Sequence, residues 1–100
     1  QEDIVHDGRR GYLIPGGSAL TARVTGTGCM LSALCGAFAA VEDDRLLAAA
    51  HAAAFWKLCA ERAETESRGL GVGSFHTALL NAAGNITDAE LAACGRLLEI

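Results

Sequence analysis

The sequence predicts an α/β protein in which a β-hairpin precedes a series of helices. Near the start of the chain, two short segments with β-branched and aromatic residues flank a polar, glycine-containing turn. From residue 28 onward alanine and leucine dominate and aromatic residues are few, which favours helix. A hairpin followed by four helices suits the C-terminal half of an α/β domain whose main sheet strands lie upstream.

The hairpin is predicted from two strand-like segments and the turn between them. Residues 3–6 and 12–14 are typical of strands, and residues 7–11, Asp-Gly-Arg-Arg-Gly, form a turn cluster. Both arginines of this turn, and Arg23 further on, are interpreted as solvated or salt-bridged surface residues. Contact with a phosphate is the alternative for each of them.

Four helices are predicted in the remainder of the chain. An extended segment over 20–25, where apolar and polar residues alternate, leads into a helix over 28–40. Ser32 is the one polar side chain of this helix, and a helix that is apolar all round is expected to be central and buried on several sides. The second helix, about 44–67, begins behind the acidic residues 42–44.

The last two helices are predicted from the residues at their N-termini. Ser74 follows a second glycine-rich loop, residues 68–73, and is expected to cap a helix that runs to about residue 83. Thr87 and Glu90 form a capping box for the final helix. This helix would bury residues at positions i, i+3, i+4 and i+7, namely Leu91, Cys94, Gly95 and Leu98.

Length, composition and charge exclude several classes of protein. One hundred residues allow one domain at most, and the 51% apolar content indicates a packed chain rather than a disordered one. The formal net charge of −4 argues against a nucleic-acid partner, but not against a phosphate held by backbone N–H groups. The alanine-rich run over 46–60 contains His51 and Lys57 and is too short to span a membrane, so no membrane partner is expected. Because the chain begins with Gln1, we expect further sequence upstream.

The cysteines do not form a pattern typical of a zinc site or a disulfide framework. The sequence contains no Cys-x-x-Cys pair, and each cysteine lies in an apolar, helix-like context. We therefore assign no metal ligands and expect a cytoplasmic location, where thiols stay reduced. The four cysteines are Cys29, Cys35, Cys59 and Cys94.

The stretch 23–33 carries the candidate functional residues. Gly26 and Gly28 flank Thr27 and lead directly into the apolar helix. Such a turn can bind an anion, because the first N–H groups of a helix lack internal partners and the helix dipole is positive there. Cys29 places a thiol on the first helical turn, where that dipole favours negative charge. From the residues alone, a tight turn into a buried core helix is an equally good interpretation.

Three segments resemble hydroxyethylthiazole kinases, which belong to the ribokinase-like superfamily. Residues 24–38, Val-Thr-Gly-Thr-Gly-Cys-Met-Leu-Ser-Ala-Leu-Cys-Gly-Ala-Phe, resemble the motif at which that family's helix begins. Residues 3–8 with 12–17 are similar to the preceding hairpin, and residues 71–75 are similar to a later Gly-Pro-Gly-Ser-Phe turn, with valine in place of proline. The resemblance implies a three-layer α/β/α fold, of which residues 1–100 form the C-terminal part of a single kinase domain.

The resemblance also implies a reaction and its residues. The reaction is ATP-dependent phosphorylation of the primary alcohol of 4-methyl-5-(2-hydroxyethyl)thiazole, in thiamine biosynthesis or salvage. Backbone N–H groups of Gly26, Thr27, Gly28 and Cys29 would form an anion hole. Cys29 stands where other superfamily members carry an aspartate base, so it would be the catalytic residue, accepting the proton of the substrate hydroxyl or orienting that hydroxyl. Gly26 and Cys29 would contact the alcohol.

Further expectations follow from the same resemblance. Mg²⁺ would accompany ATP, with its acidic ligands upstream of this chain, so no residue here is assigned to the metal. The nucleotide would lie near the hairpin and the loop that follows it. The protein would be a homotrimer with the substrate pocket at a subunit interface.

Three alternatives stay open at this point. The first is another ribokinase-like kinase that acts on a different small vitamin-precursor alcohol. The second is an enzyme that uses Cys29 as a nucleophile in acyl or thiol chemistry, which requires a histidine partner from among His6, His51 and His76. The third alternative is a structural piece that has no catalytic activity by itself.

Overall fold

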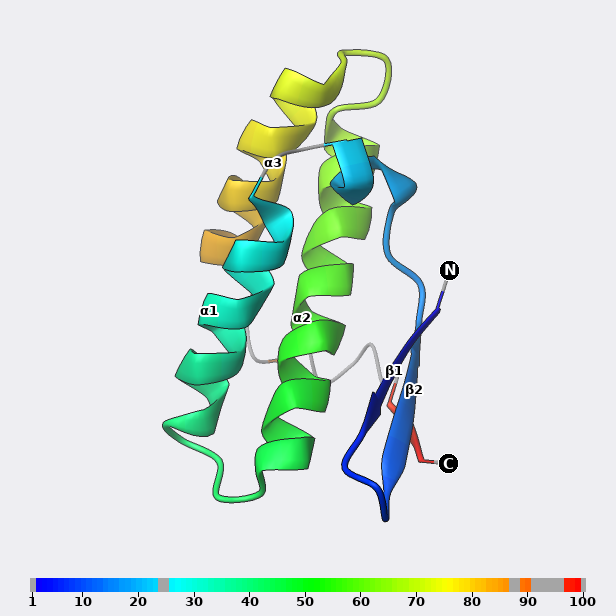
Figure 1. The fold of residues 1–100 in the computed structure, drawn as a ribbon. Helices are drawn as coiled ribbons and strands as arrows, with labels where there is room; N and C mark the ends of the chain where they lie inside the picture. Colours follow the sequence, from blue (N-terminus) through cyan, green and yellow to red (C-terminus); the bar gives the residue numbers. More distant parts are fainter. Residues whose placement is uncertain (1, 24–25, 87–88, 91–96, 100) are drawn as a thin grey trace.

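The computed structural model describes residues 2–23, 26–86, 89–90 and 97–99, as a small antiparallel sheet beside a group of helices (Figure 1). In chain order its elements are β1 (Glu2–His6), β2 (Gly11–Pro15), the 3₁₀ helix η1 (Ala19–Arg23), α1 (Thr27–Ala39), α2 (Arg45–Glu66), α3 (Val72–Asn85) and β3 (Leu98–Glu99). This mixed α/β composition confirms the predicted fold class.

The predicted hairpin is confirmed, and a short third strand extends it. β1 pairs with β2 from Glu2 opposite Pro15 to His6 opposite Gly11, and β3 lies antiparallel on the other side of β2. The Asp7 carboxylate closes the turn by accepting the N–H groups of the next two turn arginines at 2.9 and 2.8 Å. An aspartate that bonds its own backbone in this way is a common turn device.

Helix α2 is the central element of the described structure. It packs against α1, α3, η1 and both strands of the hairpin, and Figure 1 shows the hairpin on one side of α2 and α1 on the other. Alanines on several of its faces permit this close approach, because a small side chain keeps neighbouring backbones near. The buried residues form two clusters. The first contains Trp56, Cys59, Ala60, Ala63, Phe75, Ala78, Leu79 and Ala82, and the second contains Ile14, Ala50, Ala53 and Ala54.

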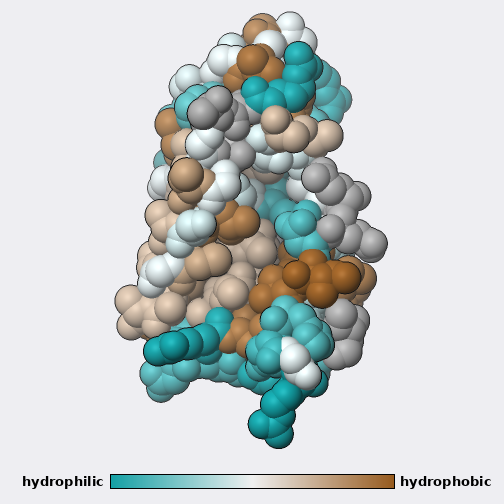
Figure 2. Space-filling view, viewed as in Figure 1, coloured by the Kyte–Doolittle hydropathy of each residue, from teal (hydrophilic) through white to brown (hydrophobic). Residues whose placement is uncertain are grey.

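Within the described residues, the first helix does not have the central position that was predicted for it. Among the α1 side chains that the structure describes, none is buried, and Val41 just beyond the helix is 86% exposed. The reason is that α1 packs chiefly against α2, so one side of an apolar helix faces outward. In the space-filling view the surface over α1 is accordingly mostly apolar (Figure 2).

The extended segment predicted over 20–25 is wrong where it can be observed, because residues 19–23 form the helix η1. Ser18 explains this conformation: its hydroxyl accepts the Leu20 N–H at 3.2 Å and its carbonyl accepts the Thr21 N–H at 3.3 Å. Local bonds of this kind override a short alternating pattern. Residues 24 and 25 lie outside the described residues.

The later helix boundaries are correct in part. α2 begins behind Asp44, as predicted, but α3 begins at Val72 after Gly71, so Ser74 lies within the helix rather than capping it. Leu98, predicted in a final helix, lies in β3 and is half exposed. Thr87, Leu91, Cys94 and Gly95 lie outside the described residues. Among the described helices, none combines the length and apolar character that a membrane crossing requires.

Candidate functional site

The glycine turn before α1 has the backbone geometry that a close-approach site needs. Gly26 is the N-cap residue of α1 and has a left-handed conformation, with φ 95° and ψ −3°, which a residue with a Cβ adopts only with strain. Its carbonyl accepts the Met30 N–H at 3.0 Å, so the helix begins directly after the turn. The N–H groups of the first turn therefore have no partner within the helix and lie at its N-terminal end, where an anion can accept their hydrogen bonds.

Cys29 lies on this first turn and is exposed. Gly28 beside it is also exposed, and its carbonyl accepts the Ser32 hydroxyl at 3.2 Å. The structure thus brings Gly26, Gly28 and Cys29 together at one end of one helix, with the backbone of Thr27 between them. The predicted start of a helix at this motif is confirmed, whereas the anion-binding and catalytic roles of these residues stay predictions.

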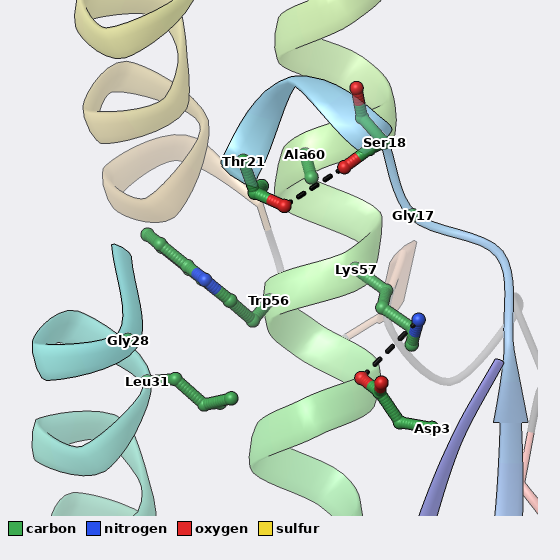
Figure 3. A pocket seen from close by; sticks show the side chains of 9 residues that line it. All are labelled: Asp3, Gly17, Ser18, Thr21, Gly28, Leu31, Trp56, Lys57 and Ala60. Carbon is green, nitrogen blue, oxygen red and sulfur yellow. Dashed lines mark hydrogen bonds and ion pairs between the residues drawn. The ribbon is translucent and has the colours of Figure 1, made fainter. Parts of the chain in front are cut away.

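A cavity of about 170 Å³ lies between the start of α1 and the hairpin (Figure 3). Gly28 and Leu31 form its wall on α1, and the Trp56 side chain extends into it from α2. On the opposite wall, Lys57 Nζ lies 3.3 Å from a carboxylate oxygen of Asp3. The full lining is Asp3, Gly17, Ser18, Thr21, Gly28, Leu31, Trp56, Lys57 and Ala60. The cavity therefore combines an apolar side with a charged one, next to the predicted anion hole.

A second cavity of about 320 Å³ lies between η1 and the second glycine-rich loop. Its lining includes two exposed arginines, Arg23 of η1 and Arg68 after α2, together with Gly69 and Gly71. The remaining lining residues are Leu20, Glu64, Ser67 and Val72. Two guanidinium groups beside glycine backbone suit an anionic ligand such as a phosphate chain.

Arg10 and Arg23, for which phosphate contact was the alternative interpretation, lie in different surroundings. Arg23 lies with the second glycine-rich loop, which the sequence could not connect across more than forty residues. Arg10, by contrast, is bound by the Asp44 carboxylate at 2.8 and 2.9 Å, which supports its structural interpretation. This ion pair links the hairpin turn to the start of α2.

Sequence reasoning did not identify Trp56, Lys57, Ser18 or Thr21 as site residues. One sequence feature could have indicated this site: Lys57 is a charged residue within an alanine-rich helix. It was interpreted only as evidence against a membrane span. Of the predicted site residues, Gly28 lines the first cavity, whereas Gly26 and Cys29 are not among the described lining residues of either cavity. Among the described residues, no three His, Cys, Asp or Glu side chains gather as a metal-binding set.

Comparison with known proteins gives concordant matches along the chain. Residues 1–89 match the model of the hydroxyethylthiazole kinase family. The chain is 46% identical over 81 residues to hydroxyethylthiazole kinase of Clostridium botulinum strain Alaska E43, covering 81% of this chain and 29% of that protein. It is 43% identical over 98 residues to hydroxyethylthiazole kinase of Roseiflexus castenholzii, covering 98% of this chain and 36% of that protein.

A solved structure shows the same arrangement of elements. The hydroxyethylthiazole kinase protein from Pyrococcus horikoshii OT3 superposes with a TM-score of 0.89 at 37% sequence identity. The match covers 99% of this chain and 38% of that chain. This chain thus spans about a third of the length of the curated relatives that it matches, at 29% and 36%.

Proposed function

The chain belongs to the hydroxyethylthiazole kinase family, and from that premise we propose that the protein transfers the γ-phosphoryl group of ATP to the hydroxyl group of 4-methyl-5-(2-hydroxyethyl)thiazole. The observation that carries this proposal is the start of α1, where left-handed Gly26 and exposed Cys29 flank the first N–H groups of the helix. That arrangement suits phosphoryl transfer, which depends more on positioning and charge neutralisation than on covalent chemistry.

The anion hole is the main electrostatic element of the proposed mechanism. The N–H groups of Gly26, Thr27, Gly28 and Cys29 would bond the γ-phosphoryl oxygens as negative charge shifts during transfer. Donors that are fixed before the reaction need no reorganisation, and removing one donor of this kind typically costs about 10²–10³ in rate. Substitution of Gly26 by a residue with a Cβ would disturb all four, because φ 95° is strained for such a residue.

Cys29 is proposed as the residue that handles the substrate hydroxyl. Its thiol group stands exposed on the same turn, so Sγ and the anion hole can reach opposite ends of the bond that forms. The hydroxyl oxygen attacks the γ-phosphorus, ADP leaves, and Cys29 Sγ accepts or orients the hydroxyl proton. A loose transition state needs little help from a base, so positioning of the hydroxyl is the larger part of this role. The backbone of Gly26 would contact the same alcohol.

We place the nucleotide in the cavity between η1 and the second glycine-rich loop. Support comes from Arg23 and Arg68, two guanidinium groups that line a space of about 320 Å³ next to glycine backbone. Mg²⁺ remains part of the proposal because it neutralises the phosphates in such reactions. The described residues offer no cluster of metal ligands, so we assign none to this chain.

The proposed setting is cytoplasmic, and the proposed assembly is a homotrimer whose substrate pocket lies between subunits. The free thiols of Cys29, Cys35 and Cys59 support a reducing compartment. The outward apolar side of α1 supports burial against further protein, whether from the rest of the domain or from another subunit.

The test is ADP formation from ATP and Mg²⁺ by the full-length protein, with and without the thiazole alcohol. We expect turnover that depends on the thiazole, and a fall in kcat of about 10² for Cys29→Ala, the lower end of what a positioned acid–base group contributes. Cys35→Ala, on the same helix, is the matched control and should keep wild-type kcat. Turnover with a different small alcohol, but none with the thiazole, would favour another vitamin-precursor kinase instead.

A further inference from the structure

Three side chains of α2 hold the loop that connects β2 to η1. Lys57 Nζ donates to the Gly16 carbonyl at 2.9 Å, and Glu61 accepts the Gly17 N–H at 2.7 Å. Glu64 accepts the Ser18 hydroxyl at 2.6 Å. The three α2 residues are spaced i, i+4 and i+7, so they share one helix face, and they bond three consecutive loop residues in order.

The burial of Lys57 shows that this contact is more than a surface ion pair. Lys57 is 7% exposed, and burying an ammonium group is unfavourable unless it is paired and hydrogen-bonded. The Gly16 carbonyl and Asp3 supply those partners. The other buried positions of α2 are mostly alanine, so packing alone does not require a lysine at this position.

The loop itself has little intrinsic preference for the conformation it adopts. Gly16 and Gly17 both have positive φ, 95° and 93°, and glycine visits many other conformations equally well. A Cβ on Gly17 would lie 3.2 Å from Lys57 Cγ, so the loop rests directly on this side chain. The hydrogen bonds from α2 therefore hold in one conformation a loop whose two glycines would otherwise adopt many.

The held loop determines where η1 presents its side chains. Ser18 is bonded by Glu64 and also begins η1, through its contacts with Leu20 and Thr21. η1 then contributes Thr21 to the cavity beside α1. It contributes Leu20 and Arg23 to the cavity proposed for the nucleotide.

We propose that Lys57, Glu61 and Glu64 are positioning residues for nucleotide binding, acting through the loop 16–18 and η1. This inference rests on the proposed kinase function and adds three residues from outside the glycine motif. Lys57 and Glu61 do not line the cavity proposed for the nucleotide, so neither needs to touch the nucleotide for the effect, whereas Glu64 also lines that cavity. Their role is to fix Arg23 and Leu20 against the second glycine-rich loop.

The decisive comparison uses Glu61, which accepts the backbone N–H group of Gly17. Glu61→Leu removes the acceptor, whereas Glu61→Gln keeps an oxygen that can accept the same bond. We expect Glu61→Leu to raise the KM for ATP about tenfold and to leave the KM for the alcohol within about twofold. Glu61→Gln should restore most of the ATP affinity. Glu66→Leu, at an exposed position on the same helix, should match wild type.

A direct binding measurement separates this inference from the kinase assignment. ATP binding by calorimetry and amide exchange at Gly17 require no turnover and no alcohol. The positioning role predicts that Glu61→Leu exchanges the Gly17 amide faster and binds ATP about tenfold more weakly, and that Glu61→Gln recovers both properties. These results would support the role even for a protein that phosphorylates another alcohol. Unchanged ATP affinity in Glu61→Leu, equal losses for both substrates, or no ATP binding by wild type would overturn it. Absence of thiazole turnover alone would overturn only the substrate assignment.

Discussion

Cys29 and Cys59 show how position sets the reactivity of the same side chain. Cys29 is exposed on the first turn of α1, whereas Cys59 is buried in the core and its burial raises the pKa of the thiol to about 12. The thiolate is the form that reacts with alkylating reagents, so a raised pKa leaves very little reactive Cys59 at neutral pH. The two cysteines should therefore be separable by chemistry as well as by mutation.

We predict that iodoacetamide at pH 8 labels Cys29 in the native protein and leaves Cys59 unlabelled. Relative to the unfolded chain, the thiolate fraction of native Cys59 should fall by about 10³, because its pKa lies well above the usual value near 8.5. Peptide mass spectrometry before and after denaturation measures both sites. Equal labelling of the two cysteines in the native protein would contradict the buried position of Cys59. Protection of Cys29 by ATP and the alcohol would connect the label to the proposed site.

At the scale of elements, sequence patterns succeeded where local chemistry decides the structure. The β-hairpin and the long helix behind Asp44 were predictable, since turn residues and an N-cap act on their immediate neighbours. The 3₁₀ helix η1 was missed because one residue, Ser18, bonds both Leu20 and Thr21 and so overrides the alternating pattern. The start of α3 was misplaced because Gly71, with φ 94°, ends the preceding loop earlier than Ser74 suggested.

The start of α2 offers a test of electrostatics at this scale. Asp44 accepts the Leu47 N–H at 3.2 Å and pairs with Arg10, and these contacts, the Arg10 hydrogen bond first, hold the pKa of Asp44 below its usual value. Because the pKa of Asp44 is lower in the folded than in the unfolded chain, its ionised carboxylate stabilises the fold above about pH 4. This contribution is lost as pH falls through the lowered pKa. We predict that Asp44→Ala lowers Tm at pH 7 by several degrees.

The control for this prediction is Asp44→Asn, which keeps the capping acceptor but removes the charge. Its Tm at pH 7 should lie between those of wild type and Asp44→Ala. The difference between wild type and Asp44→Asn should shrink as pH falls below about 4, because wild-type Asp44 then becomes neutral too. Thermal melts followed by circular dichroism measure both effects. A constant difference from pH 7 to pH 2 would show that Asp44 contributes no charge-dependent stability.

At the scale of the whole molecule, the candidate site was predictable only along one segment of sequence. Gly26, Gly28 and Cys29 are neighbours in the chain, so a motif was enough to identify them. The cavities were not predictable in this way. Arg23 and Arg68 line one cavity, and Asp3 pairs with Lys57, only because α2 brings distant segments together. Both cavities form because α2, rather than the more apolar α1, occupies the central position and packs against the other elements.

The last prediction concerns the outward face of α1, which exposes an apolar surface to solvent (Figure 2). The solved relative extends well beyond the matched region, which is 38% of its chain. We therefore expect further protein to cover α1 in the full-length molecule. Ala33, exposed in the described structure, would then be buried, and Ala33→Asp would place an unpaired carboxylate in that contact.

We predict that Ala33→Asp lowers the Tm of the full-length protein by about 10 °C, since an unpaired buried charge costs several kcal/mol. Asn81→Asp, at an exposed site on α3, is the matched control and should change Tm by no more than about 2 °C. Differential scanning calorimetry of both variants decides the question. If Ala33→Asp melts with wild type, this face of α1 is open to solvent in the full-length protein, and the proposed covering layer is contradicted. If it melts early while Asn81→Asp does not, the motif helix is held between α2 and a second layer of protein, which would fix the anion hole from both sides.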